Sequence, residues 1–116
     1  MQHAPVIRSR DNPALKRAGA VQAGKDTGAI VLEGERLVGE ARRAGLTFET
    51  VLVSEEREPL ARELEAAELP VRRVQARLLG RVSSLVTSPG ILAVCAPPRP
   101  RPLEELELAA DALALV

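Results

Sequence analysis

Residues 29–45, AIVLEGERLVGEARRAG, decide the fold of this 116-residue chain. The first four are apolar, the next two are Glu33 and Gly34, and Leu37, Val38, Ala41 and Ala44 then recur at helical spacing. This pattern predicts a strand, a tight turn and a helix. Because the strand is apolar on both faces, we expect it to be a central strand covered by helices. Glu33 and Gly34 then fall at its carboxyl end, where open α/β sheets commonly bind ligands.

Working outward, helices and strands alternate along the rest of the chain. Asn12 is a good N-cap and Pro13 fits a first helical turn, so a helix should begin there, with Lys16 and Arg17 projecting outward in no evident structural role. Further strands are expected at 47–54, 71–74 and 91–95, and further helices from Glu58 and over 76–85. The alternation predicts an α/β fold, a three-layer α/β/α sandwich with a small central sheet.

The composition excludes several classes of protein. No apolar run reaches the roughly 20 residues that span a bilayer and no signal segment opens the chain, so we expect a soluble, cytoplasmic protein without a membrane partner. The single histidine, His3, has no ligand-spaced partner, so no metal site is expected. Cys95 lies in an apolar run and is interpreted as a buried strand thiol. With Phe48 as the single aromatic residue, a base-stacking platform is excluded.

A formal net charge of zero conceals a segregation of charge along the chain. Residues 1–25 carry five Lys/Arg and one acid, and residues 71–101 carry six Arg and no acid, whereas residues 26–70 carry five Arg and eleven acids. If the two basic stretches meet in the fold, they form a basic face suited to phosphate contacts. The competing interpretation is a scattered, solvated surface.

The composition changes at Ala96. Residues 97–102, PPRPRP, are typical of an extended spacer, and a new apolar run, 112–116, follows them. We therefore expect residues 1–96 to form one domain, residues 97–102 a linker, and residues 103–116 the start of a second domain that is cut short.

Three stretches in this order resemble the N-terminal substrate-binding domain of the SpoU/TrmH-like RNA 2'-O-ribose methyltransferases of the SPOUT superfamily. The first is a Ser-x-x-Asn-Pro-x-x-Lys pattern, here Ser9, Asn12, Pro13 and Lys16. The second is an apolar strand ending in Glu-Gly before a helix with a Leu-Val pair, here 30–34 with Leu37 and Val38. The third is a Pro-Gln-Gly-apolar strand, matched by 89–94 without the glutamine. The chain also offers only Lys25 where the family often has a basic pair before the Glu-Gly strand.

The resemblance implies a fold similar to the kink-turn-binding ribosomal proteins and a role in holding structured RNA, either rRNA or tRNA, and not DNA. A following domain of the full-length parent would bind S-adenosylmethionine, methylate the ribose and form the homodimer. This stretch alone would bind no cofactor, have no catalytic residue and be inactive.

The residues expected to contact RNA are those that combine charge or polarity with a place at the first helix, the Glu-Gly corner or the last loop. They are Asn12, Lys16, Arg17, Lys25, Glu33, Gly34, Glu35, Arg36, Thr87 and Ser88. Simpler interpretations stay open for some: a pure cap for Asn12, a purely conformational role for Gly34, and a favourable helix dipole for Glu33 and Glu35. Two other functions stay open for the whole chain, namely a free-standing kink-turn binder and a protein interaction or dimer-supporting module.

Overall fold

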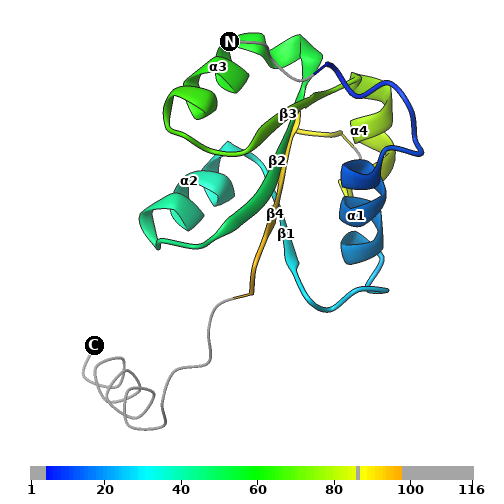
Figure 1. Ribbon diagram of the computed structural model, residues 1–116, viewed down its shortest axis with the longest axis horizontal. Helices are drawn as coiled ribbons and strands as arrows, with labels where there is room; N and C mark the ends of the chain where they lie inside the picture. The colour runs from blue at the N-terminus through cyan, green and yellow to red at the C-terminus, as the bar shows by residue number, and fades with distance from the viewer. Residues whose placement is uncertain (1–4, 86, 98–116) are drawn as a thin grey trace, which may run out of the picture.

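The computed structural model describes residues 5–85 and 87–97. Its elements follow in the order α1 (Pro13–Gln22), β1 (Ile30–Glu33), α2 (Glu35–Arg43), β2 (Phe48–Ser54), a 3-10 turn η1 (Glu55–Arg57), α3 (Glu58–Ala66), β3 (Val71–Val74), α4 (Ala76–Val82) and β4 (Ile91–Cys95) (Figure 1). The alternation expected from the sequence is confirmed. Apart from Pro97, the expected linker and the start of a second domain lie outside the described residues.

The four strands form one mixed sheet in the order β1-β4-β2-β3. β4 is antiparallel to both β1 and β2, whereas β2 and β3 are parallel. The expectation that residues 29–32 form a central strand was therefore wrong, because β1 lies at an edge. Its run of apolar residues has another cause. Ala29 and Val31 pack on one side of the sheet and Ile30 and Leu32 on the other, so both faces are covered even at the edge.

Helices cover both faces of the sheet, which confirms the three layers (Figure 1). On one face, Leu15, Ala18 and Val21 of α1 and Leu78 and Leu79 of α4 pack against Leu52, Leu92 and Val94. On the other face, Val38 of α2 and Ala61 and Leu64 of α3 pack against Val51, Val53, Ile91, Ala93 and Cys95. We call these the α1/α4 layer and the α2/α3 layer. Cys95 is fully buried in the sheet, as expected.

The ends of the helices follow the local sequence with two differences. Asn12 caps α1 and a proline occupies the first turn of both α1 and α3, as expected. However, α4 stops at Val82, because Ser83 adopts an extended conformation, so the helix expected over 76–85 is shorter. In α2 the buried stripe is narrower than predicted: Val38 and Ala41 are buried, but Leu37 is 45% exposed.

The strand directions place the candidate corner, which is Glu33-Gly34 between β1 and α2, at one end of the sheet. Because β4 is antiparallel to both β1 and β2, the carboxyl ends of β1, β2 and β3 lie together with the start of β4. The segment before α1 also reaches this end, since Ile7 forms a parallel bridge with Val74. Within the described ranges, no helix is long and apolar enough to cross a bilayer.

Candidate nucleic-acid interface

The start of α1 is built by side chains that hold their own backbone. Ser9 Oγ accepts a hydrogen bond from the Asp11 amide at 3.2 Å, and Asn12 Oδ1 accepts one from the Ala14 amide at 2.9 Å. The first bond closes a tight turn and the second satisfies one of the free amides at the helix start. The Ser-x-x-Asn-Pro pattern is thus a helix-start motif in this chain. The Asn12 side-chain oxygen is already engaged, and its contact with RNA stays a prediction.

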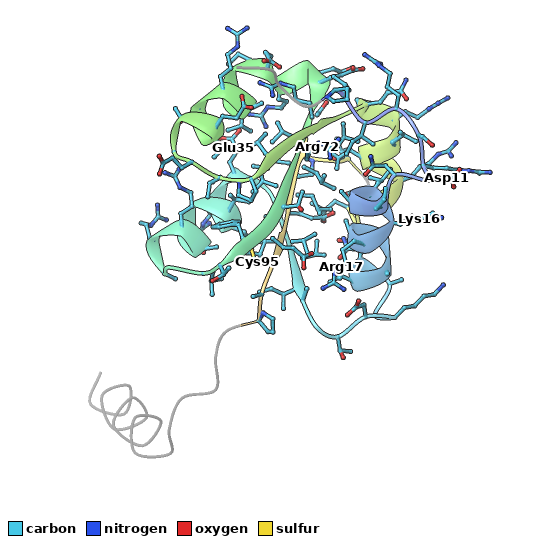
Figure 2. All side chains as sticks on the ribbon, viewed as in Figure 1. Asp11, Lys16, Arg17, Glu35, Arg72 and Cys95 are labelled. Carbon is cyan, nitrogen blue, oxygen red and sulfur yellow. The ribbon has the colours of Figure 1, made fainter. Side chains whose placement is uncertain are left out.

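Lys16 and Arg17, which are neighbours in α1, differ in their surroundings. The Lys16 side chain is 64% exposed, its ammonium lies 3.8 Å from Asp11 Oδ1, and it points away from the sheet (Figure 2). Arg17 is 32% exposed; its Nε donates to Glu49 at 3.1 Å, and its Nη1 donates to Asp26. The Glu49 hydrogen bond and the nearby Asp26 charge raise the pKa of Arg17. Arg17 therefore ties α1 to β2 and to the following loop, so the view that it has no structural role was wrong.

The carboxylate of Glu33 joins three segments. Its Oε1 accepts hydrogen bonds from the Ser84 amide at 3.0 Å and from Gln22 Nε2 at 3.1 Å, and its Oε2 accepts one from the Ser84 hydroxyl at 2.8 Å. β1 is thereby connected to the end of α1 and to the segment that follows α4. This is a structural role that the sequence did not indicate, because Ser84 lies 51 residues further along the chain.

Gly34 needs its glycine for the backbone conformation. Its φ of 100° and ψ of 150° lie in a region that residues other than glycine rarely adopt. The Gly34 amide donates to the Ile91 carbonyl at 3.1 Å, so the turn is fixed against β4 before α2 begins. The conformational interpretation of Gly34 is supported, and an additional RNA contact stays a prediction.

Arg57 organises the other half of the corner. It pairs with Glu35 at the start of α2, donates from Nη1 to the Pro89 carbonyl at 2.9 Å, and lays its aliphatic chain against Gly90. Ser88 lies in the same place, where its Oγ accepts a hydrogen bond from the Gly90 amide at 3.2 Å. A hollow of about 140 Å³ is lined by Ser54, Glu56, Arg57, Ala76, Ser88, Pro89 and Gly90. Sequence reasoning missed Arg57, because no local pattern distinguishes it from other surface arginines.

The remaining predicted residues are exposed. Arg36 is 90% exposed and has a 3.3 Å ion pair with Glu40 one helical turn away. Lys25 and Thr87 are exposed in their loops. The structure thus brings Gly34, Glu35 and Ser88 together around Arg57. It connects this end of the sheet to α1 through Gln22, which lies at the opposite end of the helix from Asn12.

One arginine of the basic stretch is neutralised inside the fold. Arg73, only 10% exposed, donates to Glu58 at 2.6 Å and to Glu65 at 2.7 Å, both on α3. The hydrogen bonds from Arg73 lower the pKa of Glu58 from 4.5 to about 2, and they raise the pKa of Arg73. Arg73 therefore fastens β3 to α3 and is not available to RNA.

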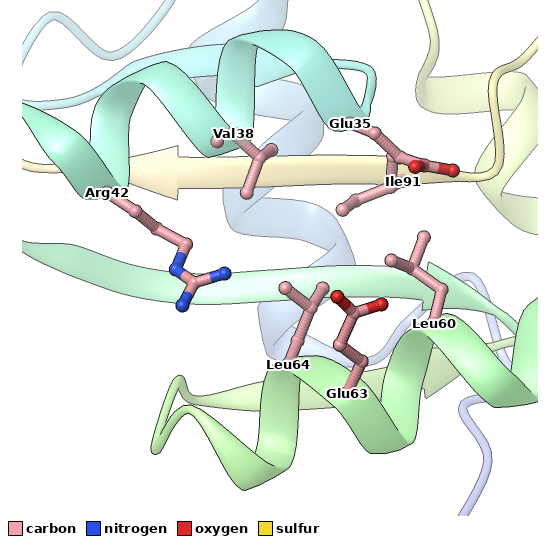
Figure 3. A pocket seen from close by; sticks show the side chains of 8 residues that line it. Glu35, Val38, Arg42, Leu60, Glu63, Leu64 and Ile91 are labelled. Atoms are coloured by element: carbon pink, nitrogen blue, oxygen red, sulfur yellow. The ribbon is translucent and has the colours of Figure 1, made fainter.

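A groove between α2 and α3 adjoins the corner, since Glu35 also lines it (Figure 3). Val38, Leu64 and Ile91 line its apolar part, and Arg42 and Glu63 its polar part. Its volume of about 190 Å³ is below the roughly 300–1,000 Å³ typical of small-molecule and cofactor sites. The groove does not fit a ligand of the size of S-adenosylmethionine.

The fold and its polar corner define a small mixed-sheet α/β domain with two helix layers. The chain belongs to the MRM3-like substrate binding domain family, whose model matches residues 14–93. These residues include all four helices and all four strands, except for Pro13 and the last two residues of β4. A comparison with curated proteins finds no match.

Three solved structures similar to this chain are RNA methyltransferases. An RNA 2'-O ribose methyltransferase is 26% identical, with a TM-score of 0.69 over 85% of this chain and 40% of that one. An rRNA methyltransferase from Sinorhizobium meliloti (18% identity, TM-score 0.64) and an AdoMet-bound rRNA methyltransferase from the same organism (21% identity, TM-score 0.66) share the fold. The first alignment covers 83% of this chain and 38% of the other, and the second covers 87% of this chain and 39% of the other. The chain thus spans about 40% of the length of these structures and corresponds to their N-terminal part.

Proposed function

We propose that this chain is the RNA recognition domain of an S-adenosylmethionine-dependent RNA 2'-O-ribose methyltransferase that acts on rRNA or tRNA. The observation that carries the proposal is the family match over residues 14–93, supported by 26% identity to a 2'-O ribose methyltransferase. Methyl transfer, cofactor binding and formation of a homodimer are assigned to parts of the full-length parent that follow this domain.

The residues proposed to form the RNA interface are those predicted from the sequence, and they have two roles: some contact the RNA directly and others hold the backbone and loops in place. Lys16, Lys25 and Arg36 have exposed charges that can reach phosphates directly. Thr87 is exposed in the last loop, where its hydroxyl can hydrogen-bond to the RNA backbone. Asn12, Arg17, Glu33, Gly34, Glu35 and Ser88 shape the backbone and hold the loops that present these groups.

Crosslinking of the full-length parent to total RNA, followed by mapping of the crosslinked nucleotides, tests the proposal. The expected result is enrichment of one structured region of rRNA or tRNA, with crosslinked peptides from this domain. Loss of 2'-O-methylation at a nucleotide near that region, on deletion of the gene, would connect binding to the reaction. Crosslinks spread over all RNA in proportion to abundance would contradict the proposal.

A second candidate function is a protein contact, and an apolar hollow favours it. Leu32, Leu37, Ala41, Ala44 and Leu46 line a shallow hollow of about 230 Å³ beside the edge strand β1. Glu40 also lines it, and Leu37, which is 45% exposed, is the large apolar side chain that it offers to a partner. Under this alternative, Leu37→Glu would alter the oligomeric state or the partners of the protein, and RNA crosslinks from this domain would be absent.

A further inference from the structure

The two helix layers differ in charge. The helices α1 and α4 contain Lys16, Arg17, Arg77 and Arg81 and no acidic residue. The helices α2 and α3 together contain four arginines and five glutamates. Because α1 and α4 pack side by side on the same face of the sheet, these four cations share one surface, where Glu49 and Asp26 offset Arg17 and Asp11 lies 3.8 Å from Lys16 (Figure 1). The segregation along the sequence therefore becomes a segregation between faces.

Arg77 and Arg81 form the outward face of α4. Leu78 and Leu79 are buried beneath them, and both arginines are exposed. They lie one helical turn apart, which places their Cβ atoms about 5–6 Å from each other. Neither has an ion pair or a hydrogen-bond partner in the part of the chain that the structure describes. Their positive charge is therefore uncompensated, unlike that of Arg17, Arg57 or Arg73.

Folding does not account for this placement. Arg77 is in the first turn of α4, where the helix dipole disfavours a cation, and no acidic side chain offsets it. The neighbouring Arg72 adds a second anomaly. It alternates with Arg73 on β3 and so faces the α1/α4 layer, and its Nε is buried with no hydrogen-bond partner among residues 5–85 and 87–97. A guanidinium donor that is removed from water without a partner costs free energy.

We infer that the α1/α4 layer binds the sugar–phosphate backbone of the RNA, with Arg77 and Arg81 as its main contacts and Lys16 beside them. A guanidinium binds a phosphate with two parallel hydrogen bonds, as it also binds a carboxylate, and the choice of a phosphodiester chain follows from the proposed function. The face carries no aromatic side chain for stacking on bases, since Phe48 packs in the α2/α3 layer. The inference rests on the proposed function and extends it to a surface beyond the corner.

The test compares two arginine pairs on opposite layers. Arg77→Ala/Arg81→Ala removes the proposed contacts. Arg42→Ala/Arg43→Ala removes two exposed arginines at the end of α2 that have no ion pair with a carboxylate within the described part of the chain. The probe is a mixture of end-labelled, fragmented ribosomal RNA and tRNA from the source organism, and binding is measured over a range of salt concentrations. We expect the α4 variant to lower the log–log salt slope by about 1.4–1.8, at roughly 0.7–0.9 for each phosphate contact, and the α2 variant to leave it unchanged.

Gly80 allows a second test that does not remove any side chain. It is exposed between Arg77 and Arg81, and a Cβ there would meet nothing within 4 Å. Gly80→Lys should strengthen binding to the same probe, and Gly80→Glu should weaken it, while circular dichroism shows that both variants fold. The opposite signs separate charge from any effect of the added side chain on the helix.

The outcomes distinguish the two claims. An unmodified chain that does not bind the RNA overturns the proposed function and this inference with it. RNA binding that Arg42→Ala/Arg43→Ala weakens as much as the α4 variant leaves the proposed function standing and overturns the inference. Displacement of the RNA by polyglutamate of equal charge overturns the assignment to phosphodiesters and points to an acidic protein partner.

Discussion

Replacing Glu33 with alanine is expected to lower the free energy of unfolding by about 1–2 kcal/mol and to loosen the segment after α4. Three hydrogen bonds end on this carboxylate, at 2.8, 3.0 and 3.1 Å. A hydrogen bond contributes about 1 kcal/mol net, and somewhat more when its acceptor is charged. The two donors of Ser84 are exposed, so water replaces part of what they lose, whereas the Gln22 bond is partly buried. The expected loss in the free energy of unfolding is therefore close to the net contribution of one to two hydrogen bonds.

Urea unfolding and amide hydrogen exchange measure the two parts of this prediction. The midpoint of unfolding should fall, and the Ser84 amide should exchange faster by more than the global loss of stability explains. The matched control is Glu40→Ala, which removes an exposed carboxylate whose one partner among the described residues is Arg36, one turn away. Pairs of that kind stabilise a helix by about 0.3–0.5 kcal/mol, so the control should change little.

RNA binding decides between the structural role and a direct contact for Glu33. If it holds the loop, Glu33→Ala weakens binding and increases Ser84 exchange together. Unchanged stability and unchanged exchange with a clear loss of RNA affinity would refute the reasoning, because Glu33 would then act on the RNA itself.

Three further predictions concern stability. The pKa of Glu58 is about 2 in the folded chain and 4.5 ordinarily, so its hydrogen bonds with Arg73 stabilise the fold fully above pH 4.5 and progressively less as the pH falls toward 2. The urea midpoint of unfolding should drop over that pH range. The midpoint of Glu58→Gln should drop less over the same range. Gly34→Ala should cost about 1–3 kcal/mol in urea unfolding from backbone strain alone, since no atom lies within 4 Å of the added Cβ, and an unchanged midpoint would contradict the conformational role. Gly80→Ala should instead stabilise the chain by about 0.5–1 kcal/mol, seen as a higher melting temperature, because Gly80 lies in a helix with open space around it; a lower melting temperature would count against that reasoning.

Local sequence patterns predicted the elements because their causes are local. The Asn12 cap, the proline in the first turn of α3 and the apolar run of β4 each act within a few residues. The place of β1 in the sheet could not be predicted in this way. An edge strand that helices cover on both faces has the same apolar pattern as a central one, and the strand order depends on pairing with β4, some 60 residues away in the chain.

The roles of the corner residues depended on partners far along the chain. Arg17 meets Glu49 across 32 residues, Glu33 meets Ser84 across 51, and Arg57 meets Pro89 across 32. Nothing in a window of sequence around Arg17 or Glu33 shows these contacts. Charge and predicted exposure alone therefore make such residues resemble free surface groups, and no local pattern separates Arg17 from Lys16.

The same contacts explain why the basic face lies on α4 and not at the corner. At the corner, the negative charge of Glu35 offsets the positive charge of Arg57. The donors to Glu33 are neutral, so its negative charge is not offset by them, and little net positive charge is left there to attract phosphate. On the other face, the four arginines of α2 and α3 are offset by five glutamates, so those helices have no net positive charge to attract a polyanion. A chain with zero net charge can thus present RNA with one attractive face, the α1/α4 layer, and orient the corner relative to the RNA through charge alone.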